Sequence, residues 1–275
     1  MFSALALAVS MPLHAQLPGE PGKAFGLGIT GAFEGWFKNP DGSFSLLVGY
    51  LNRNQKETLD IPIGPDNRFE PGNIDRGQPT HFVPRRQWGV FRIVVPKDFG
   101  DKKLKWTITA NGQTNTIPLS LNTLWEISPF KEESMGNTPP VLSFESGAPV
   151  QGPLAMGPEL TATVGVPLDL PVNVKDDAKI LAGAKEPPKT PPVVLSYEKF
   201  RGPGDIVFSN PKPPLPKDKK VTPGNYEVKL SSTATFSEPG SYIILVNAYD
   251  WSGEGGRGFQ CCWTTGHIKV LVKAK

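Results

Sequence analysis

Residues 233–253 read TATFSEPGSYIILVNAYDWSG. Two runs with the alternation of a half-buried strand flank a turn at Pro239 and Gly240. We expect Ile244 and Val246 to point into a core, and the hydroxyl of Tyr242 to cap the corner between the strands. The segment therefore predicts a pair of strands in an all-β domain.

Further strand-like runs surround this pair in the second half of the chain. Turn-forming residues separate the runs. We expect strands at residues 159–164, 166–175, 193–199, 205–208, 228–236, 241–248 and 267–272. Seven strands in this span suit a Greek-key sandwich.

Three stretches of this half resemble a known family. They are VGVPLDLPVNVKDDA (164–178), VVLSYEKFRGPGDIVFSNP (193–211) and the quoted segment 233–253. Together they resemble the PKD-type, immunoglobulin-like modules of secreted bacterial proteins, over about residues 158–273. The resemblance implies an immunoglobulin-like fold and an extracellular accessory role, and it implies no reaction. A long loop at 212–223 and the pair Cys261 and Cys262 depart from the family's pattern.

The first half is also strand-rich but resembles no family that we can name. GAFEGWFK (31–38) and SFSLLVGYLN (43–52) flank an Asn-Pro-Asp-Gly turn and predict a β-hairpin. Other strands are expected at residues 57–63, 80–83, 88–95, 103–110 and 113–119, with Asn111-Gly112 turning the last pair. Trp36, Trp106 and Trp125 are expected to fill the core.

The composition agrees with an all-β protein of two tandem β-sandwich domains. The 29 glycines and 30 prolines favour many short strands over long helices. We expect a signal peptide at residues 1–15, an N-terminal sandwich at 24–130, a Pro/Gly-rich linker at 131–157 and an immunoglobulin-like sandwich of PKD type at 158–275. The composition of that linker permits the two modules to move independently.

The expected export rests on residues 2–13, an apolar run too short to cross a bilayer, followed by Leu13-His14-Ala15. A buried N-terminal helix or strand is the alternative, and the run lacks a preceding Lys or Arg. We expect a secreted, periplasmic or cell-envelope location, with no transmembrane span.

Net charge argues against one class of partner. The chain has 29 basic and 26 acidic residues, a formal charge of +3. Such a weak balance is poor for a nucleic-acid binder. The basic run at 212–220 lies among prolines and is typical of a solvated loop.

Three carboxylates are expected at one pole of the second sandwich. In immunoglobulin-like order the loops after residues 166–175 and 241–248 lie at the same end, which brings Asp176 and Asp177 near Asp250. Carboxylates beside loop carbonyls suit a hard cation such as Ca²⁺, the one cofactor that the residues suggest. The alternative is that each carboxylate caps a local turn.

Two candidate binding clusters are rich in aromatic or basic side chains. The first surrounds the stretch GEGGRG at 253–258 and contains Tyr249, Trp251, Arg257, Phe259 and Trp263. It could stack on a sugar ring or on a partner protein, or else fold back to cover the end of the core.

The second cluster, at residues 76–88, contains Arg76, His81, Arg85, Arg86 and Trp88. It could bind an anion or a carboxylate, or it could form an edge strand whose charges prevent association. We expect His267, in the last strand, to face solvent or a cap. No nucleophile, zinc or redox motif accompanies the histidines.

Cys261 and Cys262 are the only cysteines. A vicinal disulfide, one buried and one free thiol, or a cross-link to another chain are all open.

These patterns predict a non-catalytic binding, adhesion or scaffold protein whose partner is a protein or a polysaccharide at the cell surface or in the periplasm. One alternative is a hydrolase or carbohydrate-active protein with its active site in the first module. Another is a structural subunit of a larger envelope complex.

Overall fold

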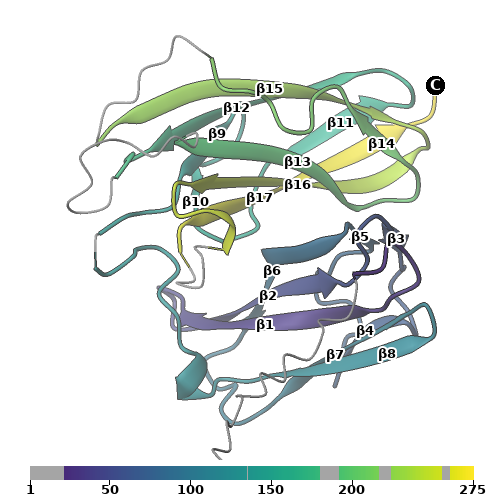
Figure 1. The fold of residues 1–275 in the computed structure, drawn as a ribbon, viewed down its shortest axis with the longest axis vertical. Coiled ribbons are helices and arrows are strands. Elements are labelled where there is room, and N and C mark those ends of the chain that lie inside the picture. Colours follow the sequence, from purple (N-terminus) through teal and green to yellow (C-terminus); the bar gives the residue numbers. More distant parts are fainter. Residues whose placement is uncertain (1–21, 135, 180–191, 217–223, 256–260) are drawn as a thin grey trace, which may run out of the picture.

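The computed structural model describes residues 22–134, 136–179, 192–216, 224–255 and 261–275. The expected signal peptide, the basic run from Lys217 onward, and the candidates Arg257 and Phe259 lie outside the described residues. No helix among the described residues is long and apolar enough to cross a membrane. The fold is all-β, and it forms two sandwiches in tandem (Figure 1).

The first sandwich packs two three-stranded sheets face to face, with a short two-stranded pair beside them. One sheet has the order β1-β2-β6, formed by Ile29–Lys38, Phe44–Asn52 and Arg85–Val95. The facing sheet has the order β4-β7-β8, formed by Asn67–Glu70, Leu104–Ala110 and Gln113–Leu119. The short pair joins β3 (Leu59–Asp60) to β5 (His81–Phe82).

Both predicted hairpins of this sandwich are confirmed. β1 pairs with β2 in antiparallel register around the turn at 39–42. β7 pairs with β8, and Asn111 and Gly112 both have positive φ, the geometry that an Asn-Gly turn supplies at low cost. β4 had no recognisable sequence pattern.

The core of the first sandwich centres on Trp106, which is fully buried and stacks on Phe69 with ring centroids 5.6 Å apart. Trp36 is 7% exposed, and its indole N–H donates to the carbonyl of Asn122. Trp125, at the end of the short 3₁₀ helix η1 (Thr123–Trp125), is 49% exposed. The expectation that all three tryptophans fill the core is therefore wrong for Trp125.

The second sandwich packs a five-stranded sheet on a four-stranded one. The order β10-β9-β12-β15-β14 comprises Val150–Gln151, Val141–Phe144, Leu168–Asp176, Tyr226–Phe236 and Ile206–Phe208. The order β11-β17-β16-β13 comprises Glu159–Thr163, Trp263–Lys273, Gly240–Asp250 and Val193–Arg201. β11 runs parallel to β17, and the other pairs are antiparallel.

The predicted turn at Pro239 and Gly240 joins β15 to β16, and the side chains around it lie as expected. Ile244 and Val246 are fully buried. The hydroxyl of Tyr242 donates to the carbonyl of Glu238 at 2.9 Å and accepts from the N–H of Gly204 at 3.0 Å. Tyr242 thus ties the β15–β16 turn to the loop that follows β13.

The stretch at 131–157 contributes strands rather than only a connection. β9 pairs with β12, and β10 pairs with β9, so part of the segment predicted as a linker extends the five-stranded sheet. The division of the chain at the predicted bounds stays a prediction.

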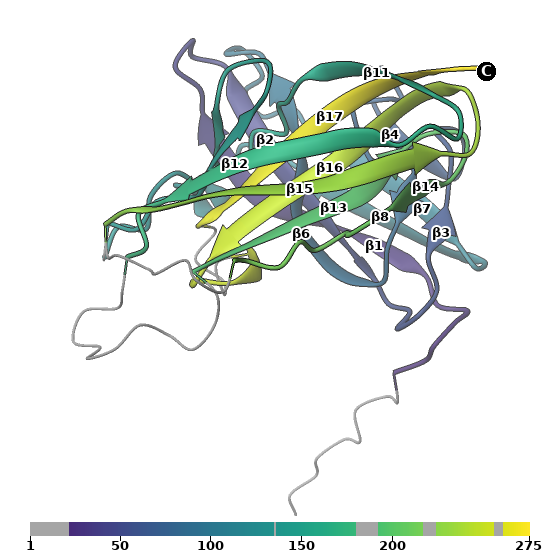
Figure 2. The same cartoon turned by 90° about the horizontal axis from the view of Figure 1, so that it is seen from above.

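The second sandwich lies directly on the first. β6 is the edge of the first sandwich's sheet that lies toward β16 and β17 (Figure 1), and the strands of the two sandwiches cross when seen from above (Figure 2). Phe200 and Leu245 of the second sandwich belong to the same buried cluster as the first core. The contact between the two sandwiches is called the junction. The buried carboxylates at one end of the second sandwich belong to a second region, the carboxylate pole.

Candidate functional site

The carboxylate pole consists of Asp176, Asp250 and Asn137. Asp176 ends β12 and Asp250 ends β16, which places both at the same end of the sandwich. Asn137 lies in the segment that enters the second sandwich, and its amide N–H donates to Oδ2 of Asp250 at 2.7 Å. All three side chains are at least 95% buried.

Two oxygen atoms of this pole have no hydrogen-bond partner. Asp176 accepts from the N–H of Ala178 through Oδ1, but its Oδ2 is buried and unpaired. Asp250 accepts from the N–H of Ser252 through Oδ1. Oδ1 of Asn137 is also buried and unpaired. A buried polar atom without a partner is costly, so both oxygens mark a place where a further group would be stabilising.

Asp177 has a different role from its neighbour. Its carboxylate accepts from the N–H and the hydroxyl of Thr138, at 3.1 and 3.0 Å, and from the N–H of Lys179 at 3.1 Å. Asp177 therefore fastens the incoming segment beside Asn137, and its oxygens are already bonded.

The electrostatics of the pole are unfavourable to two charged carboxylates. Burial, and then the charge of Asp250, raise the pKa of Asp176 from 3.8 to about 8. Burial also raises the pKa of Asp250. No Lys, Arg or His among the described residues forms an ion pair with either carboxylate. A proton on one carboxylate, or a bound cation, would relieve the repulsion between the two charges.

The donor set fits a hard cation. Two carboxylates and an amide oxygen are the ligand types that Ca²⁺ prefers. No group of three His, Cys, Asp or Glu in the described part of the chain is arranged to hold a metal. Of the oxygens at the pole, Oδ2 of Asp176 and Oδ1 of Asn137 are the unpaired ones that a cation could bind, and Asp250 lies beside them.

The junction is fastened by three consecutive residues of β13. The register of β13 against β16 shifts between Lys199 and Arg201, a β-bulge with Phe200 at its centre. In a regular strand, neighbouring side chains point to opposite faces, and a bulge re-aims them. Lys199, Phe200 and Arg201 all contact the first sandwich.

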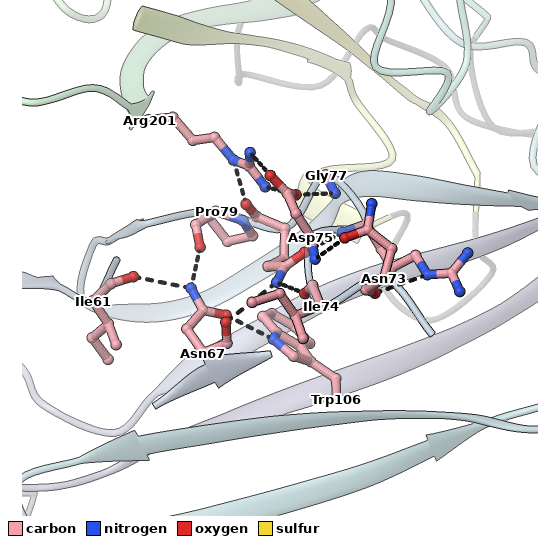
Figure 3. A network of polar contacts seen from close by, with 11 residues as sticks. Ile61, Asn67, Asn73, Ile74, Asp75, Gly77, Pro79, Trp106 and Arg201 are labelled. Atoms are coloured by element: carbon pink, nitrogen blue, oxygen red, sulfur yellow. Dashed lines mark hydrogen bonds and ion pairs between the residues drawn. The ribbon is translucent and has the colours of Figure 1, made fainter. Parts of the chain in front are cut away.

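Arg201 makes the most specific of these contacts. Its guanidinium donates to both carboxylate oxygens of Asp75, at 2.8 and 3.0 Å, and Nε donates to the carbonyl of Gln78 at 2.6 Å (Figure 3). This fork is the strong, directional form of an ion pair. Asp75 and Gln78 belong to the loop between β4 and β5. Hydrogen bonds from Nδ2 of Asn67 to the carbonyls of Ile61 and Pro79 hold this loop in place.

Lys199 and His81 share one carboxylate across the junction. The ammonium of Lys199 lies 3.1 Å from Oδ1 of Asp60, and Nδ1 of His81 lies 2.9 Å from the same atom. Burial alone would raise the pKa of Asp60, but these partners together lower it. Burial lowers the pKa of His81. His81 therefore binds the carboxylate of its own sandwich that Lys199 reaches from the other one.

Two tryptophans pack reciprocally on glycines of the opposite sandwich. A Cβ at Gly89 of the first sandwich would lie 2.6 Å from the ring of Trp263. A Cβ at Gly255 of the second would collide with the ring of Trp88. Only glycine leaves room for these rings, so the two candidate binding clusters meet each other at the junction.

A buried ion pair supports this contact. The guanidinium of Arg86 lies 3.9 Å from the Trp88 ring centroid and 2.8 Å from Oε1 of Glu34. The same oxygen accepts from the N–H of Gly89 at 2.9 Å. Burial raises the pKa of Glu34, although the Arg86 charge opposes this shift. Oε2 of Glu34 and the indole N–H of Trp263 are buried without partners.

The remaining members of the two clusters do not converge on one site. Arg76 donates to the carbonyls of Asn73 and Pro71 in its own loop. Arg85 is exposed with a φ of 73°. Tyr249 is half-buried, and Trp251 packs against the second core.

Two expectations need correction here. Trp263 is 1% exposed and cannot stack on a ligand from solution. His267 was expected to face solvent or a cap, but it is buried at the junction, where its Nε2 donates to the carbonyl of Val90 at 2.8 Å. Burial lowers the pKa of His267 to about 4. A central strand at an interface between domains buries side chains that would be exposed in an isolated sandwich.

Cys261 and Cys262 are joined by a disulfide and are both buried. The N–H of Cys262 donates to the hydroxyl of Ser252, and its sulfur lies 3.5 Å from the carbonyl of Asn137. The disulfide therefore lies beside the carboxylate pole.

Sequence reasoning missed Arg201, Asn137 and Arg92, the last of which is described below. Arg201 points at the first sandwich because of the β-bulge in β13, which no pattern in the neighbouring residues predicts. Asn137 lies in the segment predicted as a linker, where no pattern of neighbouring residues marks a buried side chain.

Comparisons with known proteins name no family. No protein-family model matches the chain, and no curated protein matches it. Among solved structures it is similar to "Anomalous substructure of Titin-A168169", with 10% identity and a TM-score of 0.25, over 88% of this chain and 98% of that chain. It is also similar to "Crystal structure of the S-layer protein SbsC domains 4 and 5", with 14% identity and a TM-score of 0.23, over 89% of this chain and 96% of that chain.

Proposed function

We propose that this protein is an exported, non-catalytic binding or scaffold protein, with a second module of PKD type, whose two sandwiches act as one rigid unit. The observation that carries the proposal is the bulge in β13, which aims three consecutive side chains at the first sandwich. A rigid unit with a fixed angle between modules presents a partner, a protein or a polysaccharide, at a defined distance from an attachment point.

The contacts of the titratable side chains support the same proposal. His81, Glu34 and Arg201 are the groups that a catalytic site would recruit, and each is paired across or beside the junction. We propose in addition that Ca²⁺ binds at the carboxylate pole. There it would supply the positive charge that the two carboxylates lack and would fix Asn137 to the ends of β12 and β16.

Rigidity can be tested by spin labels placed on opposite sandwiches. Lys105 on β7 and Lys229 on β15 are exposed, and the native cysteines are bonded to each other, so single cysteines at these sites can be labelled. We expect a narrow distance distribution by pulsed electron resonance, and a broader one when Arg201→Ala is added. A broad distribution in the parent protein would contradict a rigid unit.

The cation can be tested by thermal unfolding of the full chain. We expect excess Ca²⁺ to raise the midpoint relative to EDTA, because a ligand that binds only the folded state stabilises it. Asp250→Asn should abolish the shift, whereas Asp169→Asn, an exposed position on β12, should preserve it. An equal shift in both variants would place the ion elsewhere.

A further inference from the structure

A groove on the described surface lies beside the first sandwich, between its β1–β2 turn, β6 and the segment that leads to the second sandwich. It has a volume of about 780 Å³, in the range that encloses a drug-sized ligand. One wall comes from the end of β1 and its turn, through Phe37 and Asn39, and another from Arg92 and Val94 of β6. Phe130, in the segment that leads to the second sandwich, closes it.

The walls of the groove are apolar and partly open to solvent. Val94 is 51% exposed and Phe130 is 39% exposed, and Phe130 meets Phe37 edge to face at 5.2 Å. Exposed apolar side chains that gather around a concave surface mark a binding site more often than isolated ones do.

Arg92 is a cation in this groove that no carboxylate contacts directly, although Asp41 also lines the groove. Nη1 donates to the hydroxyl of Ser45 at 3.0 Å and, more weakly, to Oδ1 of Asn39 at 3.5 Å. No carboxylate among the described residues lies within ion-pair distance, and Nε and Nη2 have no partner there. Asp41 acts on Arg92 only through space, and its carboxylate already accepts from the N–H and hydroxyl of Ser43.

The contrast with Arg86 and Arg201 is informative. Each of those guanidiniums is partly buried and meets a carboxylate at 2.8 Å. Arg92 is also partly buried, and burial lowers its pKa, yet its open edge faces a groove. Taking a guanidinium partly out of water without a counter-charge is unfavourable, and an incoming carboxylate would offset this through two parallel hydrogen bonds.

We propose that this groove, the Arg92 groove, binds the C-terminal carboxylate of a peptide or protein whose last residue is apolar. The carboxylate meets Nε and Nη2 of Arg92, and the last side chain packs between Val94 and Phe130. The volume exceeds what a single small anion fills, which favours the end of a chain. This site goes beyond the proposed scaffold role and does not depend on it.

The test is calorimetric titration of the full chain with acetyl-Ala-Ala-Phe, as the free acid and as the C-terminal amide. We expect the acid to bind at least tenfold more tightly than the amide. Arg92→Gln should reduce the affinity for the acid to that for the amide and leave the amide unchanged. Arg53→Gln, at an exposed position elsewhere on the first sandwich, should change neither affinity.

Two further arms keep the proposal open to refutation. Arg92→Lys retains the charge but not the fork, so it should recover part of the affinity, and unfolding midpoints of all variants show whether they remain folded. Equal binding of acid and amide, or full binding by folded Arg92→Gln, would overturn the site. 3-Phenylpropionate binding as tightly as the peptide acid would overturn a chain end as the occupant. None of these outcomes bears on the spin-label distances that test the rigid unit.

Discussion

The junction and the carboxylate pole both bury charged side chains, but of the two only the junction forms ion pairs among the described residues. Arg201 meets Asp75, Lys199 meets Asp60, and Arg86 meets Glu34. At the pole, Asp176 and Asp250 face an amide and backbone N–H groups, and the described residues place no basic side chain in an ion pair with them. The described carboxylates of the junction are thus paired with cations, whereas those of the pole would be stabilised by a proton or a bound cation.

The largest expected effect tests whether the junction is a true core. Trp263→Ala should lower the free energy of unfolding by about 3–5 kcal/mol, because it empties a fully buried indole site. Trp125→Ala, at a half-exposed position, should cost less than about 1 kcal/mol. Urea unfolding monitored by circular dichroism measures both, and similar losses would mean that the sandwiches are not packed on each other at Trp263.

The pole should reveal itself by the pH dependence of stability. With a folded pKa of about 8 against an ordinary 3.8, Asp176 holds a proton in the folded state that the unfolded chain releases. The contribution of this proton to the free energy of unfolding is complete at low pH. It is lost as the pH rises to about 8, at up to about 1.4 kcal/mol per pH unit.

The pH dependence of Asp176 is best measured above pH 6.5, the ordinary pKa of histidine, where the histidine contribution no longer changes. His267 has a folded pKa of about 4, so its contribution is complete above 6.5 and is lost as pH falls below it. Between about pH 6.5 and 8, in EDTA, urea unfolding should show stability falling by about 2 kcal/mol. Asp176→Asn should flatten that slope, while Asp169→Asn should keep it. A slope unchanged in Asp176→Asn would locate the proton on another group.

A smaller effect is expected from the fork at the junction. Asp75 is 42% exposed at its side chain, so solvent screens the pair with Arg201. A double-mutant cycle with Arg201→Ala and Asp75→Ala should give a coupling of about 1 kcal/mol in the free energy of unfolding. Additive single losses would show that Arg201 acts only through packing and the carbonyl of Gln78.

The sequence predicts the elements of this fold better than their assembly. The turns at Asn111-Gly112 and Pro239-Gly240 predict hairpins well, because they need positive φ angles that few residues other than Gly and Asn adopt. The parallel pairing of β11 with β17 and the short strands β9 and β10 depend on partners distant in the chain, so no local pattern marks them.

The candidate sites divide in the same way. Immunoglobulin-like strand order brought Asp176 and Asp250 to one end, because adjacent strands of a sandwich share their poles. Trp88 and Trp263 were each assigned to a candidate binding cluster of a separate domain. That each one packs against a glycine of the other domain depends on how the sandwiches pack, which hydrophobicity along one strand does not encode.

The position of β17 bears on how the protein is made. β17 lies inside its sheet, between β11 and β16, and it carries both Trp263 and His267 to the junction. It is the last of the described strands to be synthesised, so neither that sheet nor the junction can close before β17 has left the ribosome. Until then β11 and β16 have open edges, which can pair with other strands and lead to association.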